Sequence, residues 1–178
     1  MSHYTKEELT TLILTNPSAF NDIRNTTDEE FDMTESHFNN CTLNDLNLTN
    51  IDFSGSTFAD SELSCIGFND CDLTSVDFTR ANIVECDFSE SLLTGADMSY
   101  ATVSYCNFTE TDVAGATFNG TDFSNTDLSS TDNLSACRFD EDTVWPDTDM
   151  LPDDFDGSYS GDLSMLQDEE EDSSSQDY

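Results

Sequence analysis

The chain has 178 residues, enough for one domain or slightly more, and its composition gives two opposite signals. A formal net charge of −35, from 39 acidic and only 4 basic residues, is typical of disorder, whereas 13 phenylalanines indicate a packed core. Such an acidic surface argues against direct binding to nucleic acid. Neither a signal peptide nor a stretch long enough to span a membrane is found, so a cytoplasmic location is expected.

Residues 1–30 are predicted to form an N-terminal helical cap. Thr5 followed by Glu8 is a capping box, and an apolar stripe follows it at Leu9, Leu12 and Ile13. Asn16 and Pro17 then start a shorter helix that ends near Arg24. The segment after it is repetitive, and the exposed end of a repeat array needs such a cover.

Residues 31–130 consist of five-residue units in one unbroken phase, each centred on an apolar residue. The centres are Met33, Phe38, Leu43, Leu48, Phe53, Phe58, Leu63, Phe68, Leu73, Phe78, Ile83, Phe88, Leu93, Met98, Val103, Phe108, Val113, Phe118, Phe123 and Leu128. Two residues before most centres stands a small or compact side chain, such as Cys41, Ala81 or Thr126. Both positions are expected to point inward. The residue after the centre is nearly always Ser, Thr, Asn or Ala, which predicts a tight turn.

A period of five fits neither a helix nor a simple strand, so the pattern predicts a solenoid in which stacked coils pair their backbones. The chain resembles the pentapeptide-repeat family, whose pattern A(D/N)LXX is matched at Ala81-Asn82-Ile83, Ala96-Asp97-Met98 and Thr126-Asp127-Leu128. The resemblance implies an all-β solenoid, a right-handed quadrilateral β-helix with twenty residues per coil. It also implies about five coils for this chain.

Side-chain size supports a twenty-residue coil independently. One column of residues twenty apart is Phe38, Phe58, Phe78, Met98 and Phe118, and another is Phe68, Phe88 and Phe108. With neighbouring strands about 4.8 Å apart, five coils give a rod about 24 Å long.

After Leu128 the repeat phase breaks at Asn133. Residues 131–150 contain an apolar cluster around Trp145, the only tryptophan, and are predicted to form a C-terminal cap. The alternative is that this cluster makes a dimer, as in some relatives, so the protein is expected to be a monomer or a dimer through this cap. Residues 151–178 are rich in acidic residues and serine and are predicted to be a disordered tail, with Met165 and Leu166 available to fold onto a partner.

The acidic residues of the repeats gather on one edge of the predicted coil. If coils contain twenty residues, seven acids fall on this edge and two more prolong it: Glu30, Asp32, Asp52, Asp70, Asp72, Glu90, Glu110, Asp112 and Asp132. Seven charges over about 24 Å give one charge per roughly 3.4 Å, the linear density of one strand of B-DNA. The simpler interpretation is that the family pattern itself favours Asp or Asn before the centre.

The residues for common kinds of catalysis and metal binding are missing. His3 and His37 are far apart, no glycine-rich phosphate loop occurs, and no cysteine pair has zinc-finger spacing, so neither an enzyme nor a cofactor or metal site is predicted. The cysteines are expected to be free thiols, with Cys65 the most reactive. Cys86 and Cys106 should stack at a separation that would also allow a disulfide.

Three functions remain open. The first is a non-enzymatic anionic rod that competes for a basic, nucleic-acid-binding surface of a partner protein. By the family resemblance this would be a DNA mimic, with DNA gyrase or a topoisomerase as a candidate partner. The second is a scaffold or regulatory module that binds a partner through a flat face near Leu92, Tyr100 and Tyr105. The third is adaptation of the surface to a salty cytoplasm.

Overall fold

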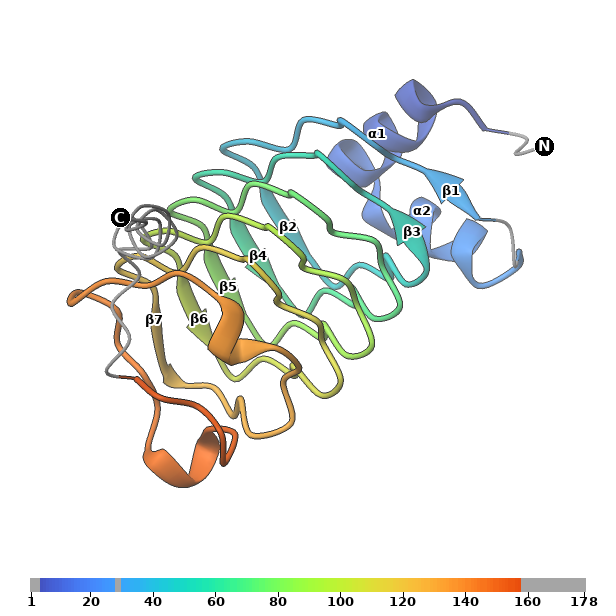
Figure 1. Cartoon of the computed structure of the whole chain (residues 1–178). Helices are drawn as coiled ribbons and strands as arrows, with labels where there is room; N and C mark the ends of the chain where they lie inside the picture. Colours follow the sequence, from blue (N-terminus) through green and yellow to red (C-terminus); the bar gives the residue numbers. More distant parts are fainter. Residues whose placement is uncertain (1–3, 28–29, 158–178) are drawn as a thin grey trace, which may run out of the picture.

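The computed structural model describes residues 4–27 and 30–157. In it the repeats form a parallel β-solenoid of square coils, with two helices at its N-terminal end (Figure 1). Each coil takes twenty residues, because Leu43 pairs with Leu63 and Leu63 pairs with Ile83, all in parallel register. The solenoid predicted from the period of five is therefore confirmed.

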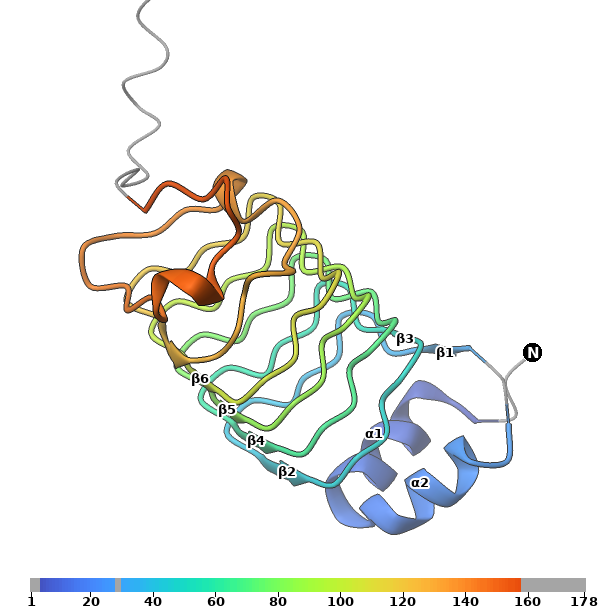
Figure 2. The same cartoon turned by 90° about the horizontal axis from the view of Figure 1, so that it is seen from below.

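Each coil has four sides, which we name by their first-coil residues as the Asp32, His37, Thr42 and Asn47 sides. The Asp32 side pairs strands β1 (Phe31–Asp32) and β3 (Ile51–Asp52). The opposite Thr42 side carries a five-stranded sheet of β2 (Thr42–Asn44), β4 (Glu62–Ser64), β5 (Asn82–Val84), β6 (Thr102–Ser104) and β7 (Asp122–Asn125). Single parallel bridges, such as His37 to Thr57 and Asn47 to Gly67, join the coils along the other two sides (Figure 2).

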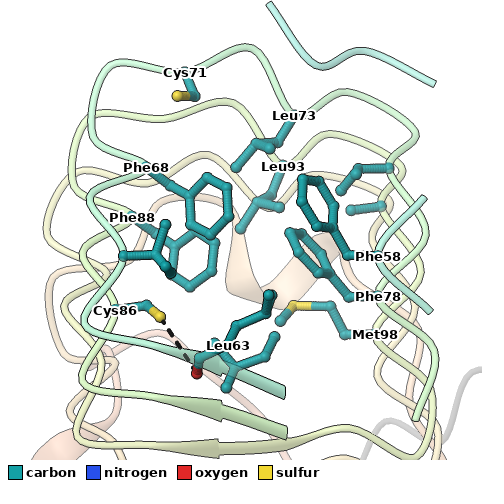
Figure 3. Packing of buried hydrophobic residues seen from close by; sticks show 14 of the residues in the cluster. Phe58, Leu63, Phe68, Cys71, Leu73, Phe78, Cys86, Phe88, Leu93 and Met98 are labelled. Carbon is teal, nitrogen blue, oxygen red and sulfur yellow. Dashed lines mark hydrogen bonds between the residues drawn. The ribbon is translucent and has the colours of Figure 1, made fainter. Parts of the chain in front are cut away.

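The interior is filled by the repeat centres, every one of which is buried. The aromatic centres form stacks along the rod, with ring centroids of Phe58 and Phe78 5.2 Å apart and those of Phe68 and Phe88 also 5.2 Å apart. The two stacks meet edge to face, since Phe58 and Phe68 lie 5.6 Å apart with their planes at 82° (Figure 3). Both predicted columns are thus present, and this geometry is favourable for aromatic rings.

Hydroxyl and thiol groups occur at the second inward position because the neighbouring coil offers them an acceptor. Ser56 Oγ donates to the carbonyl oxygen of Met33 at 2.8 Å, and Thr121 Oγ1 donates to that of Met98 at 2.8 Å. The Cys71 thiol makes the same contact with Leu48 at 2.9 Å. These buried polar groups are therefore satisfied, as burial requires.

Each corner of the coil contains a residue in the left-handed backbone conformation. The residue two positions after each centre, from Glu35 to Gly120, has a positive φ, although most of these residues are not glycine. On most sides the turn is closed by a hydrogen bond of the type Ser56 N to Phe53 O, 2.9 Å long. The residue after the centre does lie in a turn, as predicted, and the positive φ at the third residue is the mark of a type II turn.

The N-terminal end is covered by helices α1 (Lys6–Thr15) and α2 (Pro17–Arg24). Thr5 and Glu8 form the predicted capping box, and Asn16 caps α2. Phe20 is buried against Phe31 of the first coil, with their ring centroids 6.2 Å apart. The apolar stripe of the cap is inward too, since Leu9 and Ile13 are buried.

The side-chain amide of Asn21 in α2 makes the hydrogen bonds that a backbone peptide group of a preceding coil would make. Its amide nitrogen donates to Asp45 O at 2.7 Å, and its amide oxygen accepts from Asn47 N at 2.9 Å. Asn21 thereby pairs backbone groups that would otherwise form an open strand edge, the kind of edge that invites association with another chain.

The C-terminal segment continues the path of the coil with extra residues. Bridges join Asp112 to Asp132, Thr117 to Arg138 and Asp122 to Val144, so the register lengthens from twenty to twenty-two residues. The 3-10 helix η1 (Leu134–Ala136) lies in the first lengthened stretch, between Asp132 and Arg138, and a second 3-10 helix, η2 (Thr148–Met150), follows Val144. The shift begins where the sequence breaks phase, after Asp132.

Aromatic packing closes this end of the rod. Trp145 stacks on Phe123 at 5.7 Å, and Phe155 packs on Trp145 at 4.7 Å. Phe155 belongs to the segment predicted to be a disordered tail, and the structure corrects this prediction for Phe155, because its ring packs against Trp145. Residues 158–178, with Met165 and Leu166, lie outside the described part of the chain.

Candidate protein interaction site

The nine residues of the predicted acidic ridge lie along one edge of the rod, in two columns. The first, which we call the Asp column, runs along the Asp32 side. Parallel pairing joins Asp32 to Asp52, Asp52 to Asp72, and Asp112 to Asp132. The backbones of neighbouring residues in such a column are about 4.8 Å apart, the spacing of paired strands.

The second column stands at the corner just before the Asp32 side. It consists of Glu30, Asp70, Glu90 and Glu110, the last three in the left-handed conformation of a corner. A hollow between the two columns is lined by carboxylates from both, namely Glu30, Asp32, Asp52, Asp70 and Asp72. The structure therefore brings the predicted residues together on one edge.

The Asp column has a structural task besides its charge. Asp52 Oδ1 accepts a hydrogen bond from Ser54 N at 2.9 Å, and Asp72 Oδ1 accepts one from Thr74 N at 2.9 Å. Asn107 makes the same bond to Thr109 N on another side, at 3.1 Å. An acceptor is therefore needed before the centre, but a charge is not, and turn chemistry explains part of the acidity.

The corner glutamates have no such task. Within the described residues, the carboxylates of Glu90 and Glu110 accept no hydrogen bond, and both residues are exposed. Placing like charges this close costs stability through mutual repulsion. Their acidity is thus explained neither by the turn nor by a local contact.

A lysine of the N-terminal cap reaches one end of the ridge. Lys6 Nζ lies 3.6 Å from Asp32 Oδ1 and donates to Thr34 O at 2.6 Å. Hydrogen bonds from the backbone and hydroxyl of Thr34, with a smaller contribution from the Lys6 charge, lower the pKa of Asp32. Lys6 therefore offsets part of the negative charge at the end of the ridge that meets the cap.

The alternative partner face is not one surface, which corrects the prediction. Tyr100 and Tyr105 flank β6 on the Thr42 side and are 62% and 67% exposed. Leu92 lies on the opposite Asp32 side, paired in register with Asp72 and Asp112. All three are apolar and outward, but Leu92 is ten residues before Thr102 of β6, and residues ten apart in a twenty-residue coil lie on opposite sides.

The edge diagonally opposite the ridge, which we call the opposite edge, consists of Asn40, Asp60, Arg80, Tyr100 and Gly120. Arg80 makes two hydrogen bonds of 2.6 Å to the Asp60 carboxylate and so lowers its pKa. The Tyr100 ring covers Gly120, where an added Cβ would lie 2.6 Å from Tyr100 Cδ1. The sequence signal for this contact, which was not among the predictions, is the twenty-residue spacing of Tyr100 and Gly120.

The cysteines are free thiols, as predicted, including Cys86 and Cys106. The interaction with the neighbouring Cys106 thiol, together with burial, raises the pKa of Cys86. Cys65 is exposed, but its hydrogen bond to Glu85 raises its pKa, so this thiol is a weaker nucleophile at neutral pH than exposure alone suggested. Across residues 4–27 and 30–157, no cluster of His, Cys, Asp or Glu is arranged to hold a metal, and no helix is long and apolar enough to cross a membrane.

Sequence comparison agrees with the fold. The sequence profile of pentapeptide repeats matches residues 30–65, 71–104 and 106–141, in 8 copies. These matches cover more than half of the chain, and the protein belongs to the pentapeptide-repeat family. Among curated proteins no sequence matches this chain significantly.

Solved structures of the family resemble this one. A pentapeptide repeat protein from the thylakoid lumen of Arabidopsis thaliana is 24% identical over 53% of this chain and 66% of its own, with a TM-score of 0.51. Rfr23 of the cyanobacterium Cyanothece 51142 is 21% identical over 56% of this chain and 64% of its own, with a TM-score of 0.34. The plasmid-mediated fluoroquinolone resistance protein QnrB1 is 22% identical over 68% and 79%, with a TM-score of 0.25. At 24% identity the likeness to the Arabidopsis thaliana protein concerns the fold alone.

Proposed function

We propose that this protein is a non-enzymatic interaction protein whose acidic ridge competes with nucleic acid for a basic surface on a partner protein. The observation that carries the proposal concerns the corner column. Glu90 and Glu110 add negative charge beside the Asp column, although their carboxylates make no hydrogen bond within the described residues. Two columns of carboxylates on a rigid rod offer a basic groove a regular array of charges, as a nucleic-acid backbone does.

The rigidity of the ridge favours this role. The Asp column is held by hydrogen bonds to the backbone, and the core beneath it is a continuous stack of buried rings. Charges fixed before binding lose little conformational entropy when a partner docks. DNA gyrase and other topoisomerases are candidate partners, because family members that occupy their DNA-binding surface share this fold. A cytoplasmic location is part of the same proposal.

Affinity capture tests the proposal. The immobilised protein is incubated with cell lysate at low and at high salt, beside a variant carrying Asp70→Asn, Glu90→Gln and Glu110→Gln. We call it the ridge-neutral variant because these three corner acids lose their charge, while the Asp column is kept. The proposal expects the natural protein to retain nucleic-acid-binding proteins more strongly at low salt than at high salt, since exposed charges are screened at high salt. Equal retention by both proteins would contradict it.

A second candidate function rests on the Thr42 side. Tyr100 and Tyr105 at the two ends of β6 are the most exposed large apolar side chains of the repeats, and aromatic residues are enriched in protein interfaces. A scaffold that binds here would lose its partner on Tyr105→Ala and keep it in the ridge-neutral variant. Retention that is unaffected by salt would favour this second function.

A further inference from the structure

Leu92 interrupts the Asp column. In the first five coils the column reads Asp32, Asp52, Asp72, Leu92 and Asp112, and the parallel bridges place Leu92 directly between Asp72 and Asp112. Its side chain is 45% exposed. An apolar side chain therefore reaches the surface in the middle of the ridge.

Leucine is a poor choice at this position for stability. Asp72 and Asp112 each accept a hydrogen bond from the backbone two residues later, at 2.9 and 3.0 Å, whereas leucine offers no acceptor to Thr94 N. A single exposed leucine is ordinary on a protein surface. This one forgoes a turn hydrogen bond that the same position makes in neighbouring coils, so its presence calls for another explanation.

The surroundings of Leu92 are charged on three sides. Asp72 and Asp112 lie one coil away in each direction, and Glu90 stands at the corner of its own coil. A partner that approached through charge alone would be matched better by a sixth carboxylate here. An apolar group ringed by carboxylates is instead suited to an apolar pocket or side chain surrounded by Lys and Arg.

We propose that Leu92 is the apolar anchor of the ridge, and that the partner is a protein whose basic surface carries an apolar group opposite it. This inference rests on the proposed function, and it defines the partner more closely. Carboxylates attract any basic surface, whereas Leu92 distinguishes one basic partner from another. Because burial of apolar area does not depend on screening, part of the binding persists at high salt.

Two lysine-rich peptides of equal length and charge serve as probes, one with a central tryptophan and the other with a central glycine. We expect the tryptophan peptide to bind the natural protein about tenfold more tightly, from burial of the exposed part of Leu92. The matched variant is Leu92→Asn, which keeps the net charge and supplies an acceptor for Thr94 N, as Asn107 does for Thr109. In this variant the preference for tryptophan should disappear, while the glycine peptide binds as before.

Isothermal titration calorimetry at two salt concentrations separates the outcomes. The proposal that Leu92 is the anchor is contradicted if Leu92→Asn leaves the preference for tryptophan unchanged, or if Tyr105→Ala removes it instead. The proposed function of the acidic ridge is unaffected by either result. If neither peptide binds in a salt-dependent way, or if the ridge-neutral variant binds the glycine peptide equally well, the proposed function itself fails.

Discussion

The acidic ridge and the opposite edge are built on the same backbone, yet their side chains do different work. On the opposite edge Arg80 pairs with Asp60, and the Tyr100 ring packs over Gly120. On the ridge, carboxylates face carboxylates from coil to coil, from Asp32 to Asp52 and on to Asp72. One edge is stabilised by its side chains, and the other carries like charges that oppose folding.

This difference teaches that the coil tolerates either chemistry, because the fold is held from inside. The corner residues of both edges have positive φ, whether they are Glu90 or Arg80. The energy that fixes them comes from the buried centres and from the hydrogen bonds between coils. Surface positions are consequently free to serve binding, and on the ridge they carry like charges whose repulsion lowers stability.

Phe88→Ala should have the largest effect, because it removes a ring from the stack beneath both edges. Phe88 is fully buried between Phe68 and Phe108, with centroid distances of 5.2 and 5.1 Å. We expect a loss of about 3 to 5 kcal/mol in the free energy of unfolding, measured by denaturant titration. A loss below about 1 kcal/mol would show that the core is not the shared support of the two edges.

Gly120→Ala should be the next most damaging change, and Gly115→Ala is its control. Both glycines have positive φ, so alanine costs about 1 kcal/mol at either site. Only at Gly120 does the new Cβ collide with the Tyr100 ring, whereas the space around Gly115 is open. Thermal unfolding should therefore show that Gly120→Ala is less stable than Gly115→Ala. Equal stabilities would contradict the packing of the Tyr100 ring over Gly120.

The ridge-neutral variant should be more stable than the natural protein, by about 1 kcal/mol at low ionic strength. Its three changes keep residues that fit the corners while removing like charges from Asp70, Glu90 and Glu110. Adding salt should stabilise the natural protein and shrink the difference. Unfolding curves at two salt concentrations measure this, and a destabilised variant would mean that the corner acids make stabilising contacts.

Asp60→Asn should have the smallest effect, with a characteristic pH dependence. The pair with Arg80 lowers the pKa of Asp60 below the ordinary value of 3.8, so its stabilisation is present above that value and is lost as the pH falls through the folded pKa. The variant should therefore be slightly less stable than the natural protein at neutral pH and equal to it in strong acid. Denaturant unfolding at neutral and at acid pH measures this, and a difference in stability that does not shrink in acid would contradict the contribution of the pair.

The sequence alone predicted the solenoid because a period of five constrains every inward side chain at once. The ridge could be placed as well, since the family resemblance implies a coil of twenty residues and the columns of phenylalanine such as Phe58 and Phe78 support it. The helical cap was predictable from local signals, namely the capping box of Thr5 and Glu8. These features depend on spacing within the chain, which sequence shows directly.

Contacts that depend on side-chain geometry were not predictable in the same way. Asn21 pairs with the first coil through its amide, and nothing in the sequence around it marks that role. Leu92 was grouped with Tyr100 and Tyr105 as one apolar face, although the coil directs it to the opposite side. The position of Phe155 at the start of the acidic segment follows from its packing on the partly buried ring of Trp145, a contact that the spacing of the sequence does not show.

Competition with DNA tests the central claim most directly. A protein captured on the ridge is incubated with a labelled duplex, and fluorescence anisotropy follows the duplex as this protein or the ridge-neutral variant is added at low salt. The account predicts that the natural protein releases the duplex and that the variant releases far less. If the captured protein binds the duplex and this protein at the same time, the ridge does not occupy a nucleic-acid site and the account is contradicted.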